Sequence, residues 1–158
     1  MNYKIVAVLF LPFLLLFGHL SEKTGVNLKQ LEDHLFLLVN HERNLRGLPA
    51  LQFNSRLYAM ARAHSKKMIE ENRLAHDFPG YPKLSVRALQ AGLHFSSVGE
   101  NLAIGDTTVM KYFHEQMLAS PGHSQNTLDK DYTHMAIAIL KRGNQYYITQ
   151  DFANIYEP

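Results

Sequence analysis

Two imidazoles and one carboxylate are the side chains in this sequence that are best suited to chemistry. They belong to His76, to Glu100 after Gly99, and to His123 after the Ser-Pro-Gly segment at 120–122. Imidazole and carboxylate groups bind divalent metals such as zinc, and they also exchange protons near neutral pH. We expect function to reside where these three side chains meet. Their types leave open whether they bind a metal or form a hydrogen-bonded polar cluster without one.

Several common kinds of catalytic site are missing from the sequence. It contains no cysteine, which removes thiol nucleophiles and thiolate metal ligands. The stretches that begin at His41 and His114 start like the His-Glu-x-x-His motif of zinc proteases, but each has leucine in place of the second histidine. There is no Gly-x-Ser-x-Gly motif, and the proximity of Ser120 to His123 in sequence does not create a nucleophile with its base. A serine hydrolase is therefore not expected.

The size and charge of the chain restrict its domain count and its partners. It has 158 residues, 46% of them hydrophobic, which suits one domain with its own core. Its formal net charge is +2. So small a charge gives no electrostatic reason to expect binding to nucleic acid or to an anionic membrane.

The beginning of the chain has the pattern of a secretory leader. Lys4 precedes an apolar run, Ile5 to Phe17, that is interrupted only by Pro12. This run is too short for a comfortable membrane span but fits the apolar region of a signal peptide. We expect residues 1–18 to be a signal peptide and the protein to be secreted or to reside in the periplasm or cell envelope. Contact with a membrane is expected only if the leader stays uncleaved.

The elements that must position these groups are helices first and a hairpin last. Helical periodicity predicts helices over 27–46 and after the N-cap Asn54, where His64 lies on an apolar stripe and is interpreted as a core residue. Shorter helices are expected at 86–91, after Thr107 or Thr108, and around His123. The apolar run 135–140, a turn and the segment 145–152 predict a buried hairpin. This order indicates an α+β domain over 26–156, with a small antiparallel sheet between helical layers.

Several short motifs in this chain follow one another in a fixed order. They are Asn40-x-x-Arg43, Gly47-Leu48-Pro49-x-Leu51, His76, Arg87, Gly99-Glu100-Asn101-Leu102-Ala103, Ser120-Pro121-Gly122-His123-x-x-Asn126 and Thr149-Gln150-x-Phe152. Together they resemble the CAP superfamily of cysteine-rich secretory proteins, insect venom antigens and plant pathogenesis-related proteins, most of all its bacterial secreted branch. The resemblance covers about residues 35–152. It implies a three-layer α-β-α sandwich with an open central cleft, in agreement with the pattern of elements.

The resemblance also implies a set of cleft residues. Members of the family usually place two histidines and two acidic residues in the cleft, where divalent metal binding recurs. His76, His123 and Glu100 match the two histidines and the first acid. Ser120 stands at the position of the second acid, and Met117 stands where an aromatic residue is usual. This departure leaves three groups of the family's four.

The sequence leaves three kinds of function open. The one we favour is an exported, non-enzymatic binding module whose cleft takes a lipid, glycan or peptide, with or without a divalent cation such as zinc. The alternative is a metal-assisted hydrolase of peptides or cell-wall material, with Glu100 as base and His76 and His123 as ligands. A structural envelope protein is a third class. The missing second acid favours binding, because only three side chains remain and few of them would be available for catalysis in addition to binding. Locally, Gly99 and Glu100 are also consistent with a tight turn in which the carboxylate is structural.

Overall fold

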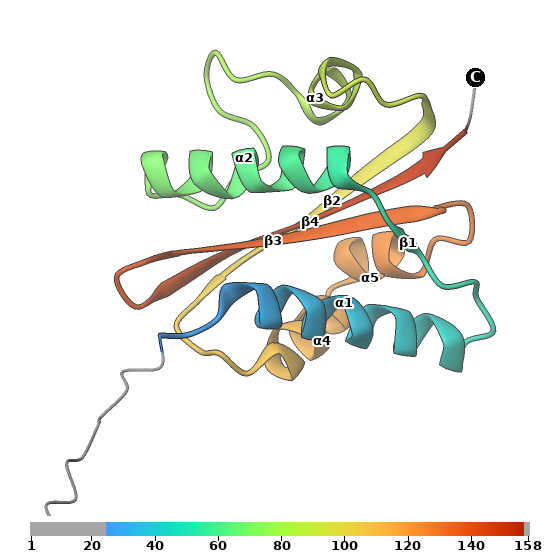
Figure 1. Ribbon diagram of the computed structural model, residues 1–158, viewed down its shortest axis with the longest axis horizontal. Helices are drawn as coiled ribbons and strands as arrows, with labels where there is room; N and C mark the ends of the chain where they lie inside the picture. Colours follow the sequence, from blue (N-terminus) through green and yellow to red (C-terminus); the bar gives the residue numbers. More distant parts are fainter. Residues whose placement is uncertain (1–24, 157–158) are drawn as a thin grey trace, which may run out of the picture.

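The computed structural model describes residues 25–156, so the expected signal peptide lies outside the described residues and stays a prediction. Within that range a four-stranded sheet lies between two layers of helices (Figure 1). One layer is formed by α2 (Ser55–Glu71) and α3 (Leu84–Gln90), and the other by α1 (Leu28–Leu45), α4 (Met110–Ala119) and α5 (Pro121–Leu128). The α+β three-layer prediction is confirmed. None of the helices among residues 25–156 has the length and hydrophobicity needed to cross a bilayer.

The sheet has the strand order β1-β3-β4-β2. Its strands are β1 (Gln52–Phe53), β2 (Phe95–Gly105), β3 (His134–Arg142) and β4 (Gln145–Ile155). The predicted hairpin is β3 and β4, which pair antiparallel, and β2 pairs antiparallel with the other side of β4. Only the two-residue β1 runs parallel, against the start of β3. The central strand β4 therefore has a neighbouring strand at each edge, and most of its residues are buried.

The strand β2 excludes the tight turn that was one alternative for the segment around Gly99. Gly99, Glu100 and Asn101 lie in the middle of an 11-residue strand, not in a tight turn. Glycine is required there because of a close approach: a Cβ atom at position 99 would lie 2.6 Å from Asn126 Oδ1 and even closer to the Tyr132 hydroxyl. The missing side chain thus lets α5 and the following loop pack directly on β2.

The two long helices form where the sequence predicts them. Asn27 caps α1 by accepting a hydrogen bond from the backbone of Gln30, and Asn54 caps α2 in the same way. The buried residues of α1 recur at helical spacing, and the main core lies between the sheet and α1 and α4. The short helix α3 begins at Leu84, two residues before the predicted start. Among these helices, α3 and α5 contact β2, the strand that carries Glu100.

Candidate functional site

The site is centred on the carboxylate of Glu100, whose side chain is 1% exposed. Its Oε1 accepts a hydrogen bond from His76 Nδ1 at 2.9 Å, and its Oε2 accepts one from Arg87 Nη2 at 2.8 Å. The Nε2 atom of His64 lies 3.6 Å from Oε1. Burial raises the pKa of Glu100, but the hydrogen bond from His76 and the charges on Arg87 and His64 outweigh this and lower it. Glu100 is therefore an ionised carboxylate and a weak base.

His76 is the exposed member of this pair. It lies in the segment after α2, which ends at Asn72 in the left-handed conformation with φ 50°. Its side chain is 58% exposed, and the hydrogen bond to Glu100 raises its pKa in spite of partial burial. Because Nδ1 faces Glu100, the free nitrogen of the ring is Nε2. A cavity of about 400 Å³ adjoins this ring and is lined by His76, Asp77, Lys83, Leu84, Ser85, Val98 and Glu100.

His123 reaches the same region from the other helical layer, on α5. Burial lowers the pKa of His123, and the charge of His76 lowers it further. His123 is not among the residues that line the cavity beside His76. Asn101 holds the helix in place by donating from Nδ2 to the backbone oxygen of His123 at 3.1 Å. Asn126 donates in turn to the backbone oxygen of Glu100 at 3.2 Å. These amide contacts attach α5 to β2 and fix the backbone of His123.

Ser120 ends α4 and stands at the N-cap of α5, but its side chain makes no capping hydrogen bond. It is half-buried. Its role as a cleft residue stays a prediction. The neighbouring Ser124 donates its hydroxyl to the backbone oxygen of Pro121 at 3.1 Å, which satisfies it within its own helix.

The expected three-ligand metal set is not assembled among the described residues, and it stays a prediction. Across residues 25–156, no group of three or more His, Cys, Asp or Glu side chains is placed to hold a metal ion. Both carboxylate oxygens of Glu100 already accept hydrogen bonds, one from His76 and one from Arg87. Glu100 therefore orients His76, and the imidazoles of His76 and His123 remain as a partial ligand set.

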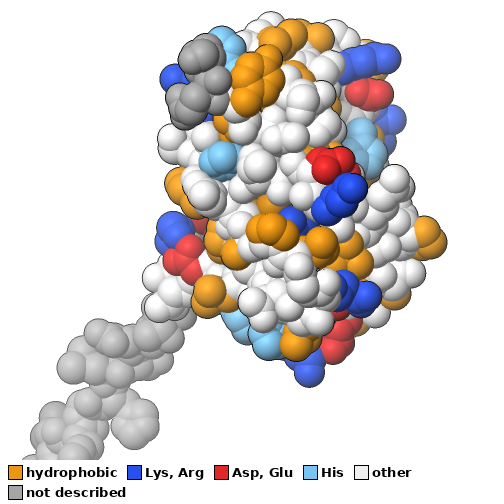
Figure 2. Space-filling model, turned by 90° about the vertical axis from the view of Figure 1, so that its right-hand side faces the viewer, with side chains coloured by type: hydrophobic (Ala, Val, Ile, Leu, Met, Phe, Trp, Pro, Cys, Tyr) orange, Lys and Arg blue, Asp and Glu red, His pale blue; other side chains and the backbone are white. Residues whose placement is uncertain are grey.

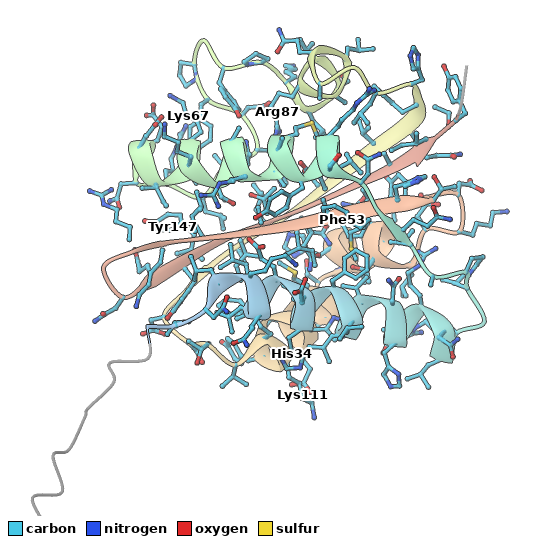
Figure 3. The ribbon with its side chains drawn as sticks, viewed as in Figure 1. His34, Phe53, Lys67, Arg87, Lys111 and Tyr147 are labelled. Atoms are coloured by element: carbon cyan, nitrogen blue, oxygen red, sulfur yellow. The ribbon has the colours of Figure 1, made fainter. Side chains whose placement is uncertain are left out.

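Sequence reasoning missed three members of the cluster around Glu100. Arg87 was part of a motif without an assigned role, yet its side chain is 5% exposed and points from α3 toward the interior (Figure 3). Its guanidinium carbon lies 5.5 Å from the ring centroid of Tyr81. His64 is buried as predicted, and its Nε2 also lies 3.0 Å from the backbone oxygen of Ala75. A histidine on an otherwise apolar stripe was the only sequence signal for its place in the cluster.

Asp151 is the third missed residue and faces Glu100 across the β2–β4 pair. It is 0% exposed, and no group among residues 25–156 donates a hydrogen bond to either of its oxygens. Burial raises the pKa of Asp151 well above its ordinary value, the charge on Glu100 raises it further, and Arg87 offsets this only in part. This shift favours the protonated form of Asp151 beside the charged Glu100. No sequence signal could show this pairing before the strand register was known.

The neutral state of Asp151 predicts a pH dependence. The folded protein keeps a proton that the unfolded chain loses above the ordinary aspartate pKa, so unfolding releases a proton and the free energy of unfolding falls as pH rises. Asp151→Asn removes the contribution of this carboxyl group to the pH dependence of the free energy of unfolding. We expect the variant to gain stability relative to the parent as pH rises, at a limiting rate of about 1.4 kcal/mol per pH unit.

Urea denaturation at a series of pH values between about 4 and 8 measures this difference. The matched control is Asp106→Asn, which removes an exposed carboxylate, and the pH dependence of Asp151→Asn should exceed that of this control. A pH dependence for Asp151→Asn no larger than that of the control would show that Asp151 is ionised in the folded protein.

The surface outside the cluster is mixed in charge. On the face that Figure 2 presents, acidic, basic and hydrophobic side chains are interspersed, with no continuous patch of one sign. This agrees with the small formal net charge of +2.

Comparisons of sequence with known proteins identify the family. The model of the cysteine-rich secretory protein family (CAP) matches residues 36–152. The uncharacterized protein YkwD of Bacillus subtilis is 32% identical over 121 residues, which cover 77% of this chain and 46% of YkwD. The uncharacterized membrane protein YlbC of the same organism is 30% identical over 125 residues, covering 77% of this chain and 34% of YlbC. The chain thus spans less than half the length of these relatives.

Solved structures show the same fold. An extracellular SCP-domain protein from Bacillus anthracis matches with a TM-score of 0.72 at 26% identity, over 79% of this chain and 40% of that one. An outer surface protein of Borrelia burgdorferi matches at a TM-score of 0.77 and 20% identity, over 83% of this chain and 97% of that one. NaASP2, solved with Zn²⁺, matches at a TM-score of 0.54 and 7% identity, over 85% of this chain and 83% of that one. The last two show the fold alone. With the family model matched over residues 36–152, this chain belongs to the CAP family of cysteine-rich secretory proteins.

Proposed function

We propose that this chain is an exported, non-enzymatic binding module that takes its ligand in the cleft around His76, Glu100 and His123. The observation that carries the proposal is the 2.9 Å hydrogen bond from His76 Nδ1 to the buried Glu100 carboxylate. It fixes an exposed imidazole with its other nitrogen free. Export is supported by the apolar leader at residues 1–18 and by the extracellular B. anthracis relative.

A divalent cation of the zinc type is part of the proposed binding. Histidines that bind metals usually donate their second ring N–H to a carboxylate, which orients the ring and raises its basicity. Glu100 stands in this relation to His76, and within residues 25–156 no hydrogen bond occupies the ring nitrogens of His123. Two imidazoles leave coordination positions for ligand oxygens, so a lipid, glycan or peptide with an acidic or hydroxyl group suits the cleft.

The hydrolase alternative receives less support from the same contacts. A general base needs a free lone pair directed at the substrate, but both oxygens of Glu100 accept hydrogen bonds and its pKa is lowered. The hydroxyl of Ser124 is engaged with Pro121. Binding therefore requires only groups that the cleft presents, whereas hydrolysis would require the rearrangement of Glu100.

Zinc titration of the purified domain by isothermal calorimetry tests the proposed roles. We expect a saturable signal in the parent that is lost in His76→Ala and His123→Ala. In Glu100→Gln, which keeps an acceptor for His76 but loses the charge, we expect zinc affinity to fall by about 10- to 100-fold without disappearing. His94→Ala, at an exposed histidine outside the cleft, is the control and should bind zinc like the parent.

Each outcome assigns a role. Complete loss of zinc binding in Glu100→Gln would make Glu100 a ligand, and no saturable signal in the parent would remove the cation from the proposal. A separate assay follows turnover of peptide and peptidoglycan pools, for which we expect no cleavage. Reproducible cleavage that Glu100→Gln abolishes would replace the binding module by the hydrolase.

A further inference from the structure

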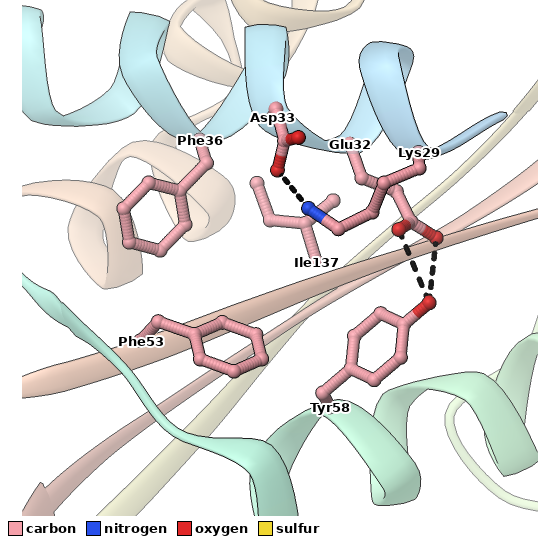
Figure 4. Close-up of a pocket in the computed structure, with 7 residues that line it drawn as sticks. All are labelled: Lys29, Glu32, Asp33, Phe36, Phe53, Tyr58 and Ile137. Atoms are coloured by element: carbon pink, nitrogen blue, oxygen red, sulfur yellow. Dashed lines mark hydrogen bonds and ion pairs between the residues drawn. The ribbon is translucent and has the colours of Figure 1, made fainter. Parts of the chain in front are cut away.

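A second cavity lies across the sheet from the cleft, at the β3 edge, whereas Glu100 belongs to the β2 edge. It opens between α1 and the start of α2, where the short β1 leaves the sheet (Figure 4). Its volume is about 50 Å³, or about 300 Å³ with the open mouth included, so it is much smaller than the cleft beside His76. Three of its seven lining residues are aromatic, and Ile137 of β3 lies at the base. We call this cavity the aromatic notch.

Three rings from three elements surround the aromatic notch. Phe36 comes from α1, Phe53 from β1 and Tyr58 from α2 (Figure 4). The centroids of Phe53 and Tyr58 are 5.9 Å apart, and the two ring planes are inclined by 50°. Phe53 is 56% exposed, which is unusual for a large aromatic side chain. Aromatic rings attract organic cations when a ring face is accessible to the cation.

A buried carboxylate supplies negative charge to the same space. Glu32 is 5% exposed, accepts a hydrogen bond from Ile139 N at 2.9 Å and accepts another from the Tyr58 hydroxyl at 3.1 Å. Burial raises the pKa of Glu32, and the hydrogen bonds from Ile139 and Tyr58 and the charges of Lys29 and Arg62 oppose this in part. Both hydrogen-bond partners are donors, so the contacts themselves favour the ionised carboxylate. The nearby ammonium of Lys29 is exposed and bonds to Asp33. Exposed pairs of this kind contribute little, so an incoming cation can displace Lys29 at small cost.

We propose that the aromatic notch binds a methylated ammonium group, with Phe36, Phe53 and Tyr58 around the cation and Glu32 as its counter-charge. The hydrogen bonds of Glu32 decide the kind of cation. Because Ile139 and Tyr58 already use its oxygens as acceptors, Glu32 offers charge more than hydrogen-bonding capacity. A quaternary ammonium has no N–H groups and needs only charge and ring faces, whereas a primary ammonium would need free acceptors.

The proposal is tested by two-dimensional ¹H–¹⁵N NMR titration with choline chloride. The amide of Ile139 is the reporter, because its proton is donated to Glu32. The matched probe is 3,3-dimethylbutan-1-ol, which has the shape of choline without its charge. We expect a saturable shift with choline and none with the alcohol. Equal shifts with both probes would overturn the proposal, since they would report apolar filling of the notch.

Substitutions identify the groups that carry the binding. Phe53→Leu keeps an apolar residue at an exposed position but removes a ring, and we expect choline affinity to fall about tenfold. Glu32→Gln keeps an acceptor for Ile139 and removes the charge, and we expect a similar or larger loss. Glu115→Gln, an exposed carboxylate on α4, is the control. Unchanged affinity in Phe53→Leu would overturn the proposal even if Glu32→Gln does not fold.

Vesicle sedimentation distinguishes the two sources of such a group. Pelleting with phosphatidylcholine vesicles but not with phosphatidylglycerol vesicles would assign a lipid headgroup. Shifts with free choline and no pelleting would assign a small soluble compound. Neither outcome depends on the cleft around His76, so this test stands or fails apart from the zinc titration.

Discussion

Arg87→Leu is expected to lower the free energy of unfolding by about 3–5 kcal/mol. The guanidinium of Arg87 and the carboxylate of Glu100 are 5% and 1% exposed, and they are joined at 2.8 Å. Leucine would leave Glu100 as a buried charge without the hydrogen-bonded guanidinium of Arg87, opposite the buried Asp151. Urea denaturation measures the loss, and the midpoint should fall without a change in the slope.

The control for Arg87 is an exposed ion pair. Lys111 and Glu115 are 70% and 58% exposed, so Lys111→Met should cost no more than about 1 kcal/mol. A loss in Arg87→Leu as small as that of the control would mean that Glu100 is protonated in the folded protein. A second measurement follows the His76 ring by NMR during a pH titration. Because the charge of Arg87 lowers the pKa of His76, we expect that pKa to rise in Arg87→Leu.

Arg43→Met is expected to cost at least about 3 kcal/mol of stability. Arg43 is 0% exposed at the end of α1 and donates hydrogen bonds to three backbone oxygens. These belong to Pro49 at 2.9 Å, to Thr127 at 2.9 Å and to Asp129 at 2.8 Å. Methionine fills similar volume but leaves these buried carbonyls without a donor. Thermal and urea denaturation of the variant against the parent measure the loss.

The contacts of Arg43 also connect this prediction to the cleft. Thr127 and Asp129 lie at the end of α5, the helix that carries His123. If Arg43 positions that helix, the zinc affinity of Arg43→Met should fall together with its stability. Arg46→Met is the control, because Arg46 is exposed and pairs with Glu42 one turn away. Full zinc affinity in a folded Arg43→Met variant would show that Asn101 and Asn126 suffice to position α5.

The parts of the fold that the sequence predicted are those with local signals. The helices α1 and α2 begin at asparagine caps and bury residues at helical spacing, so their bounds follow from neighbouring residues. The hairpin is a continuous apolar run, a turn at Gly143 and a return strand. The strand β2 had no such signal, because Gly99, Glu100 and Asn101 are poor strand formers. They form a strand because β4, α3 and α5 pack around them.

In the candidate site, too, some contacts could be predicted from the sequence and others could not. His76 and Glu100 were expected together and form a hydrogen bond, and the charge of His76 reaches His123. Spacing alone could not show that Arg87 would take the second oxygen of Glu100, nor that Asp151 would face it from the next strand. Both facts depend on how the strands align. They show Glu100 hydrogen-bonded to His76 and Arg87, and its candidate role as a ligand stays a prediction.

The bond between Glu32 and the amide of Ile139 has a consequence for self-association. Because β1 pairs only with residues 134 and 135, the rest of the outer side of β3 has no neighbouring strand among residues 25–156. An uncovered strand of this kind is a template on which a second molecule can add its own strand, which is a route to aggregates. A carboxylate bound to the amide of Ile139 occupies that template at its middle. The hydrogen bond to Glu32 therefore leaves the Ile139 amide unavailable to pair with a strand of another molecule.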